Sequence, residues 1–202
     1  MQDKLFTDLF DLVQALAGVD SFTPAESSKV IALANRRLYE AYNQSQSWTR
    51  YLVVGEEREL TSQSIPFAET DLDTISDFLR IHRTQPFLNL SAVEYEFYVD
   101  AAGANILNPT DSSPTTAFAT YKKVWDGPYD VSRTDVPMEF FYFAAHATFA
   151  DFLRMDGQLD KAMAEETVAQ GYLASELQKA ESQRNNNITV RRISTHLSRQ
   201  SR

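Results

Sequence analysis

The segment from Phe140 to Leu153 constrains the fold more than any other part of the sequence, because almost every position in it is apolar. It reads FFYFAAHATFADFL and contains one acidic residue, Asp151. A helix that is apolar around its whole circumference is stable only when other elements cover it on all sides. Pro137 precedes the segment, and proline is well suited to the first turn of a helix. We therefore expect a buried helix over residues 137–155, with further helices packed around it.

Two N-terminal segments have the patterns of such helices. Leucines recur at a 4-3-4 spacing over residues 3–17, which is typical of an amphipathic helix, and Gly18 follows as a stop signal. Thr23 and Glu26 stand three residues apart, as the two halves of a capping box do, with Pro24 between them. This arrangement predicts the start of a second helix, over residues 24–46.

A fourth helix is expected after Gly157, over residues 158–183. Large apolar residues recur there at helical intervals, and the alanines among them would let a neighbouring helix approach closely. The run Asn185–Asn187 is expected to end this helix, because asparagine favours helix termini and turns over helix interiors.

The helical period disappears between residues 49 and 130, where turn residues multiply. The clearest strand is residues 93–99, in which Val, Tyr, Phe and Val alternate with more polar neighbours. Asp100–Asn105 would turn this strand back into Ile106, forming a hairpin, and residues 108–115 have the composition of a loop. Other strands are expected over residues 51–54, 60–67, 75–82 and 118–125.

These elements together predict an α+β chain that is mainly a bundle of four helices. A small antiparallel β insert would occupy residues 49–130 of a body that spans residues 1–183. Residues 184–202 would form an extended C-terminal arm. No run of about 18 or more apolar residues occurs, so we expect no membrane span.

The net charge also changes sign where this arm begins. The chain has 19 Lys and Arg and 28 Asp and Glu, for a formal charge of −9. Residues 184–202 hold five arginines and no acid, so they carry +5, which leaves −14 on residues 1–183. One interpretation of the C-terminal segment is a solvated, frayed chain end. The other is an arm that orders on an acidic protein groove or on nucleic acid.

No catalytic or metal-binding motif is apparent. The chain has no cysteine, and the sequence matches none of the common phosphate-binding, nucleophile-elbow or zinc motifs. His82, His146 and His196 share no ligand spacing, and we interpret His146 as a hydrogen-bonded core imidazole. We expect no enzymatic activity, no cofactor and no metal.

Two acidic clusters are interpreted as structural. Asp71, Asp73 and Asp77 lack the further oxygen ligands and the glycine turn of a calcium loop, so we expect solvated loop carboxylates or a helix cap. Glu165 and Glu166 lack the histidine of a di-iron helix and are interpreted as part of a solvated face.

Several short motifs follow one another in a distinctive order along most of the chain. They are Asn35–Tyr39 before Ser47-Trp48, Ile65-Pro66 before Asp77–Ile81, Tyr95–Phe97 before Asp100–Gly103, Thr120–Lys123 before Gly127–Tyr129, then Val136–Glu139 and Ala150–Arg154. This series resembles the head-to-tail connector proteins of tailed bacteriophages, also called adaptor or head-completion proteins. The ending Ile193–Arg202 is similar to family tails that reach the portal protein.

The resemblance implies a structural virion protein at the head–tail junction, made in the host cytoplasm. About twelve copies would form a closed homo-oligomeric ring beneath the portal, and tail, nozzle or stopper proteins would join its other side. The ring would continue the DNA ejection channel, and genomic DNA would pass without sequence-specific binding. The C-terminal residues expected to dock on the portal are Arg184, Ile188, Val190, Arg191, Arg192, Ile193, Arg199 and Arg202.

A different class of function stays open at this point. The chain could be a small nucleic-acid- or protein-binding module that acts through its basic C-terminal segment. DNA binding by the segment would favour this alternative, whereas ring assembly with a portal would favour the connector.

Overall fold

The computed structural model describes residues 3–86, 93–107, 114–130 and 135–200, and the side chains of those residues up to Gln183. The chain divides into two compact units. The helical unit consists of residues 1–48 together with residues 126–202, and the β unit consists of residues 49–125. Each unit has its own interior and is described separately below.

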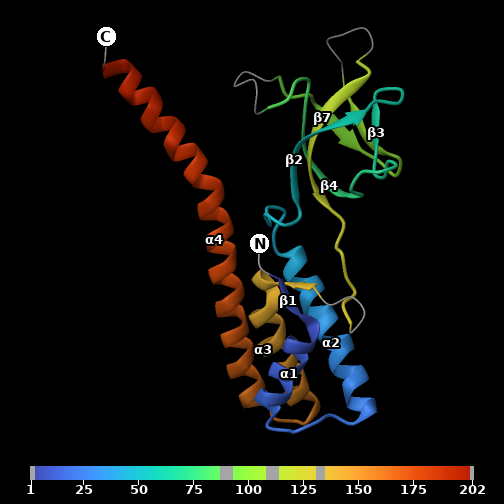
Figure 1. Cartoon of the computed structure of the whole chain (residues 1–202), viewed down its shortest axis with the longest axis vertical. Coiled ribbons are helices and arrows are strands. Elements are labelled where there is room, and N and C mark those ends of the chain that lie inside the picture. Colours follow the sequence, from blue (N-terminus) through green and yellow to red (C-terminus); the bar gives the residue numbers. More distant parts are fainter. Residues whose placement is uncertain (1–2, 87–92, 108–113, 131–134, 201–202) are drawn as a thin grey trace. The chain divides into compact units, whose positions relative to one another are not determined.

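The described part of the helical unit contains four helices and one short pair of strands (Figure 1). The helices are α1 (Phe6–Ala17), α2 (Pro24–Asn43), α3 (Met138–Met155) and α4 (Leu159–Gln200). Strand β1 (Asp3–Leu5) pairs antiparallel with β8 (Asp135–Pro137), which leads directly into α3.

Helix α3 is the centre of this unit and packs against α1, α2 and α4. Its aromatic and alanine side chains are buried on several faces, as its continuous apolar sequence requires. On α4 the buried positions Ala162, Ala169, Leu173 and Ala180 follow a 7-4-7 spacing. This is one stripe of a helix, and its small residues let α4 lie close to α3.

Local signals fix the start of α2 and the end of α1. The Thr23 hydroxyl accepts a hydrogen bond from the Glu26 backbone N–H at 3.4 Å, and the Glu26 carboxylate accepts one from the Thr23 backbone N–H at 2.9 Å. The predicted capping box is therefore confirmed. Gly18 ends α1 in the left-handed conformation at φ +68°, where a side chain would be strained.

The β unit is built from two three-stranded antiparallel sheets around one core. One sheet has the order β2 (Leu52–Glu59), β7 (Thr116–Lys123), β4 (Ile75–His82), and the other has the order β3 (Ser64–Pro66), β6 (Gly103–Ile106), β5 (Phe97–Val99). The hairpin predicted around Asp100–Asn105 is confirmed, with Val99 opposite Ala104. Residues of both sheets meet in the core, among them Ile65, Ile81, Ile106 and Tyr121.

The prediction of a mainly helical bundle with a small β insert is wrong. The described chain is α+β, 45% helical, with four helices and eight strands in three small antiparallel sheets. The β region is a substantial unit because Ile, Tyr and Ala side chains from strands far apart in sequence close a core of their own. Helical periodicity predicts where helices lie, but it does not show whether short strands pack together into a core of their own.

The prediction of an extended C-terminal arm is also wrong. Helix α4 does not end near Gln183 but continues to Gln200. Asparagine has a backbone N–H and lowers helix stability by only a fraction of a kcal/mol relative to alanine, so three of them need not end a helix. At the N-terminus, α1 begins at Phe6 rather than at residue 3, because Asp3–Leu5 pair as a strand.

No helix in the described ranges combines the length and the apolar character needed to cross a membrane. The predicted loop over residues 108–115 lies largely outside the described residues, which resume at Pro114.

Candidate functional site

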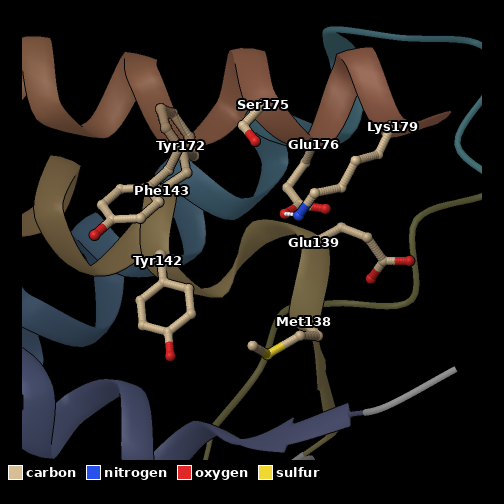
Figure 2. A pocket seen from close by; sticks show the side chains of 8 residues that line it. All are labelled: Met138, Glu139, Tyr142, Phe143, Tyr172, Ser175, Glu176 and Lys179. Carbon is tan, nitrogen blue, oxygen red and sulfur yellow. Dashed lines mark hydrogen bonds and ion pairs between the residues drawn. The ribbon is translucent and has the colours of Figure 1, made fainter. Parts of the chain in front are cut away.

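A groove between α3 and α4 is lined by aromatic and acidic side chains (Figure 2). Its volume is about 270 Å³. Helix α3 contributes Met138, Glu139, Tyr142 and Phe143, and α4 contributes Tyr172, Ser175, Glu176 and Lys179. The groove therefore presents side chains that are three or four positions apart on each helix, as one helix face does.

Stacked rings form the aromatic part of this surface. The Tyr172 ring stacks with the Tyr142 ring at a centroid distance of 5.4 Å and with the His146 ring at 5.2 Å. Tyr142 and His146 are four residues apart on α3, so one aromatic residue of α4 reaches both. Tyr142 is 39% exposed and Tyr172 is 42% exposed. Exposed tyrosine faces of this kind suit contact with apolar groups or cations.

The carboxylates of the groove differ in their partners. Glu176 accepts a hydrogen bond from Lys179 at 2.5 Å, one helical turn away. The Glu139 carboxylate is turned away from that pair in Figure 2. Its Oε2 atom is buried and has no hydrogen-bond partner among the described residues. A buried carboxylate oxygen without a donor is energetically costly, whereas the residue as a whole is half-buried and lines the groove.

His146 is fixed at the edge of the groove rather than exposed as a free base. Its Nδ1 lies 2.9 Å from Glu165 Oε2, and its side chain is largely buried. The interpretation of His146 as a hydrogen-bonded imidazole is confirmed, and its partner is a carboxylate of α4.

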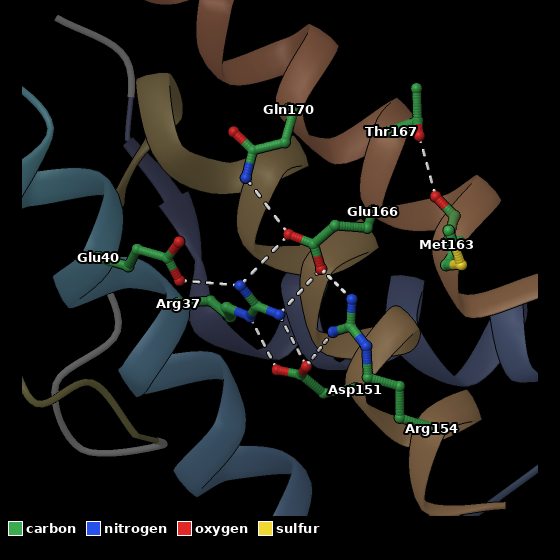
Figure 3. Close-up of polar contacts among 8 residues, drawn as sticks. All are labelled: Arg37, Glu40, Asp151, Arg154, Met163, Glu166, Thr167 and Gln170. Carbon is green, nitrogen blue, oxygen red and sulfur yellow. Dashed lines mark hydrogen bonds and ion pairs between the residues drawn. The ribbon is translucent and has the colours of Figure 1, made fainter. Parts of the chain in front are cut away.

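Nearer the C-terminal end of α3, a network of charged side chains joins α2, α3 and α4 (Figure 3). Arg37, which is only 9% exposed, donates to both Asp151 oxygens at 2.7 Å. It also donates to Glu166 at 2.9 Å and to Glu40 at 2.8 Å. Arg154 donates to Asp151 at 2.6 Å and to Glu166 at 3.0 Å. Two arginines are thereby shared by three carboxylates from three helices.

Electrostatics hold this network in its ionised form. Burial alone would raise the pKa of Asp151, but the hydrogen bonds and charges of Arg37 and Arg154 outweigh it, so the pKa is lowered. Burial alone would lower the pKa of Arg37, but Asp151, Glu40 and Glu166 outweigh it, so the pKa is raised. Every charge in the network has an opposite partner, and the network therefore acts as a structural clamp between the three helices.

The interpretation of Glu165 and Glu166 as a solvated face is therefore wrong. Glu165 binds His146, and Glu166 binds both arginines of the network. A signal was present in the sequence, because Asp151 stands within an otherwise apolar helix and a buried acid requires a cation nearby.

The β unit buries charged groups as well. The Arg58 side chain is fully buried, and its Nη2 donates to the Asp73 carbonyl at 2.7 Å and to the Tyr121 hydroxyl at 2.5 Å. Burial, followed by the hydrogen bond to Glu56, raises the pKa of Tyr121 despite the opposing effect of Arg58. These contacts tie β2 to β7 and to the turn before β4.

The acidic cluster before β4 carries no metal site in the described chain. Asp71 and Asp73 are exposed, as predicted, and Asp77 lies within β4. Over the ranges with described side chains, no three His, Asp or Glu side chains gather in a way that could hold a metal ion.

The predicted docking residues of the C-terminus lie on or after the last part of α4. Arg184, Ile188, Val190, Arg191, Arg192, Ile193 and Arg199 belong to this helix, but their side chains lie outside the described ones, and Arg202 lies outside the described residues. Their role therefore stays a prediction.

Comparisons with protein-family models and with curated proteins find no match for this chain. The connector resemblance therefore rests on the ordered motifs of the sequence.

Proposed function

We propose that this chain is a structural subunit of a ring that joins a phage head to its tail beneath the portal. The observation that carries the proposal is that large apolar side chains are exposed on the clamped helices α3 and α4. Met155, Leu159, Met163 and Val168 are large apolar residues exposed along the end of α3 and the first turns of α4, with Met163 at 67%. Leu159 and Met163 are four positions apart and so share one side of α4, and adjacent exposed apolar side chains are typical of protein interfaces.

The charged clamp between α2, α3 and α4 supports the same proposal. Arg37, Asp151 and Glu166 fix three helices to one another, so the surface is presented by a preorganised scaffold. Preorganisation lowers the entropy that association must overcome. A subunit that transmits force between a head and a tail benefits from such rigidity.

Charge supports the conduit part of the proposal. Residues 1–183 carry −14, so a ring of them repels DNA phosphates rather than binding them. The basic residues 184–202 then serve attachment to the portal, where arginines would pair with carboxylates. In this proposal, about twelve copies stand beneath the portal, and tail or stopper proteins bind the opposite side.

Electron microscopy tests the proposal. The purified chain is mixed with a portal ring encoded by the same genome and examined by negative staining. We expect a second ring to be added coaxially to the portal. Unchanged portal rings at saturating concentrations of the chain would refute the proposal.

The basic helical end of α4 favours one second candidate, a DNA-binding module that acts through this segment. Band-shift assays with duplex DNA at physiological salt distinguish the two functions. Micromolar binding by the full chain that is lost in residues 1–183 would favour the module. The connector proposal also predicts no DNA binding by residues 1–183. It differs in predicting that the full chain binds DNA more weakly than micromolar, in a salt-sensitive way.

A further inference from the structure

The outer face of α2 carries an exposed stripe that complements the groove between α3 and α4. Lys29, Ala32, Arg36 and Tyr39 are all exposed and recur at a 3-4-3 spacing, which places them on one side of the helix. The opposite side of α2, with Val30, Ala34 and Leu38, is buried in the helical unit. The stripe therefore points away from the unit and cannot reach its own groove.

The stripe and the groove carry opposite chemistry. Lys29 and Arg36 are cations, and Arg36 forms no hydrogen bond or ion pair with any described residue. The groove offers the half-buried Glu139 carboxylate and two exposed tyrosine rings (Figure 2). A guanidinium can donate to the carboxylate while its flat face lies on an aromatic ring.

Shape is consistent with this pairing. Two parallel ridges of side chains with a hollow between them are the usual receiving surface for a helix. Ala32 lies between the two cations of the stripe, and its small side chain would let α2 approach the groove closely.

We propose that the Lys29–Tyr39 face of α2 in one copy docks into the α3–α4 groove of a second copy, with Arg36 beside Glu139 and against Tyr142 or Tyr172. This inference rests on the proposed ring, because it names the contact between its neighbouring subunits. The two faces differ, so the contact is head-to-tail: each pairing leaves one groove and one α2 face open for the next copy. In a closed ring, a neighbouring copy occupies every groove and every α2 face.

Charge exchange tests this contact. R36E and E139R are each assayed for self-association by sedimentation velocity, with and without the portal ring, next to the double variant R36E/E139R. We expect each single variant to associate at least about tenfold more weakly, and the double variant to recover most of the loss because the charges are exchanged but still opposite. R80E and E57R in the β unit are matched controls, because they change exposed residues by the same charge.

Cross-linking gives a second, independent readout. The chain has no cysteine, so A32C on α2 and S175C in the groove are the sole thiols of the variants that carry them. A short bis-maleimide should join A32C to S175C when the two variants are mixed, and should join neither variant to itself. The variant A32C/S175C should give a ladder of covalent oligomers, whereas A32C/E57C should not.

The outcomes separate this inference from the proposed function. Normal rings formed by R36E and E139R, without the mixed cross-link, would overturn the α2–groove contact and leave the ring intact. A wild-type chain that stays monomeric with and without the portal would overturn both. Equal losses in R80E and E57R would show a general charge effect and would also overturn the proposed contact.

Discussion

Arg37 links three helices of the helical unit, because it is the shared partner of carboxylates from α2, α3 and α4. Its neighbour Arg36 is exposed and has no such role within the unit. Adjacent arginines thus serve different purposes, and the helical period decides which: Arg37 faces inward with Leu38 and Ala41.

We expect R37A to lower the free energy of unfolding by about 3–5 kcal/mol, because Asp151 would be left as a buried charge without its main partner. E40A should cost less than about 1 kcal/mol, since Glu40 is a partly exposed partner one turn away. Denaturant unfolding followed by circular dichroism measures both. Similar losses for the two variants would contradict the clamp.

The lowered pKa of Asp151 predicts how stability depends on pH. A carboxylate with a lowered pKa in the folded state stabilises the protein above its unfolded pKa of about 3.9, and that contribution is lost as pH falls through the folded value. We expect D151N to be less stable than wild type at pH 7 and to lose less stability on acidification below about pH 4. The free energies of unfolding of D151N and of the wild type are measured against pH, and parallel curves would contradict this expectation.

At the scale of elements, the start of α2 was predictable because its signals are local. Thr23, Pro24 and Glu26 act on the backbone within one turn, and the structure shows each in its expected role. The strand expected over residues 75–82 is confirmed as β4, whereas the strand expected over residues 93–99 is reduced to Phe97–Val99. In contrast, β1 and β8 could not be predicted from local pattern, because three-residue strands form only when a distant partner supplies their hydrogen bonds.

The candidate site was harder to predict than the helices. Tyr142 and Tyr172 are thirty positions apart, and only the packing of α3 on α4 brings their rings together. Likewise Arg37 meets Asp151 across 114 positions of sequence. Periodicity shows which face of a helix is buried but not which neighbouring helix it meets.

The capping box gives a prediction for α2. T23A should lower the free energy of unfolding by about 1 kcal/mol, because the Glu26 backbone N–H loses its acceptor and the reciprocal bond is weakened. S27A, in the same helical turn, is the matched control and should change stability by less than about 0.5 kcal/mol. Thermal unfolding of both variants measures the difference, and equal effects would count against the cap.

The end of α4 gives a second prediction at this scale. Removing residues 184–202 should reduce the far-ultraviolet helical signal by the contribution of the helical residues 184–200, while the melting temperature of the remaining chain stays nearly unchanged. The reason is that the last described buried position of α4 is Ala180. A truncated chain with an unchanged helical signal would contradict the helical assignment of residues 184–200.

At the scale of the whole molecule, the connector proposal assigns each protein contact to a different region of the chain. In this proposal, the α2 face and the α3–α4 groove would bind neighbouring copies, and the basic end of α4 would bind the portal. R191E/R192E should therefore weaken portal attachment strongly, because it reverses two of the five positive charges of that segment. K4E/K161E is the matched control on exposed lysines of the same unit. Pull-down with immobilised portal rings measures both, and equal attachment by the two variants would contradict the assignment of α4's end.

The most direct test of the central claim is the mass of the complex formed between this chain and portal rings, measured by native mass spectrometry. The connector account predicts a single added mass that corresponds to about twelve copies per portal ring, as closed symmetry requires. Truncation to residues 1–183 should abolish that added mass without unfolding the body. A portal mass that is unchanged by excess full-length chain would contradict the account.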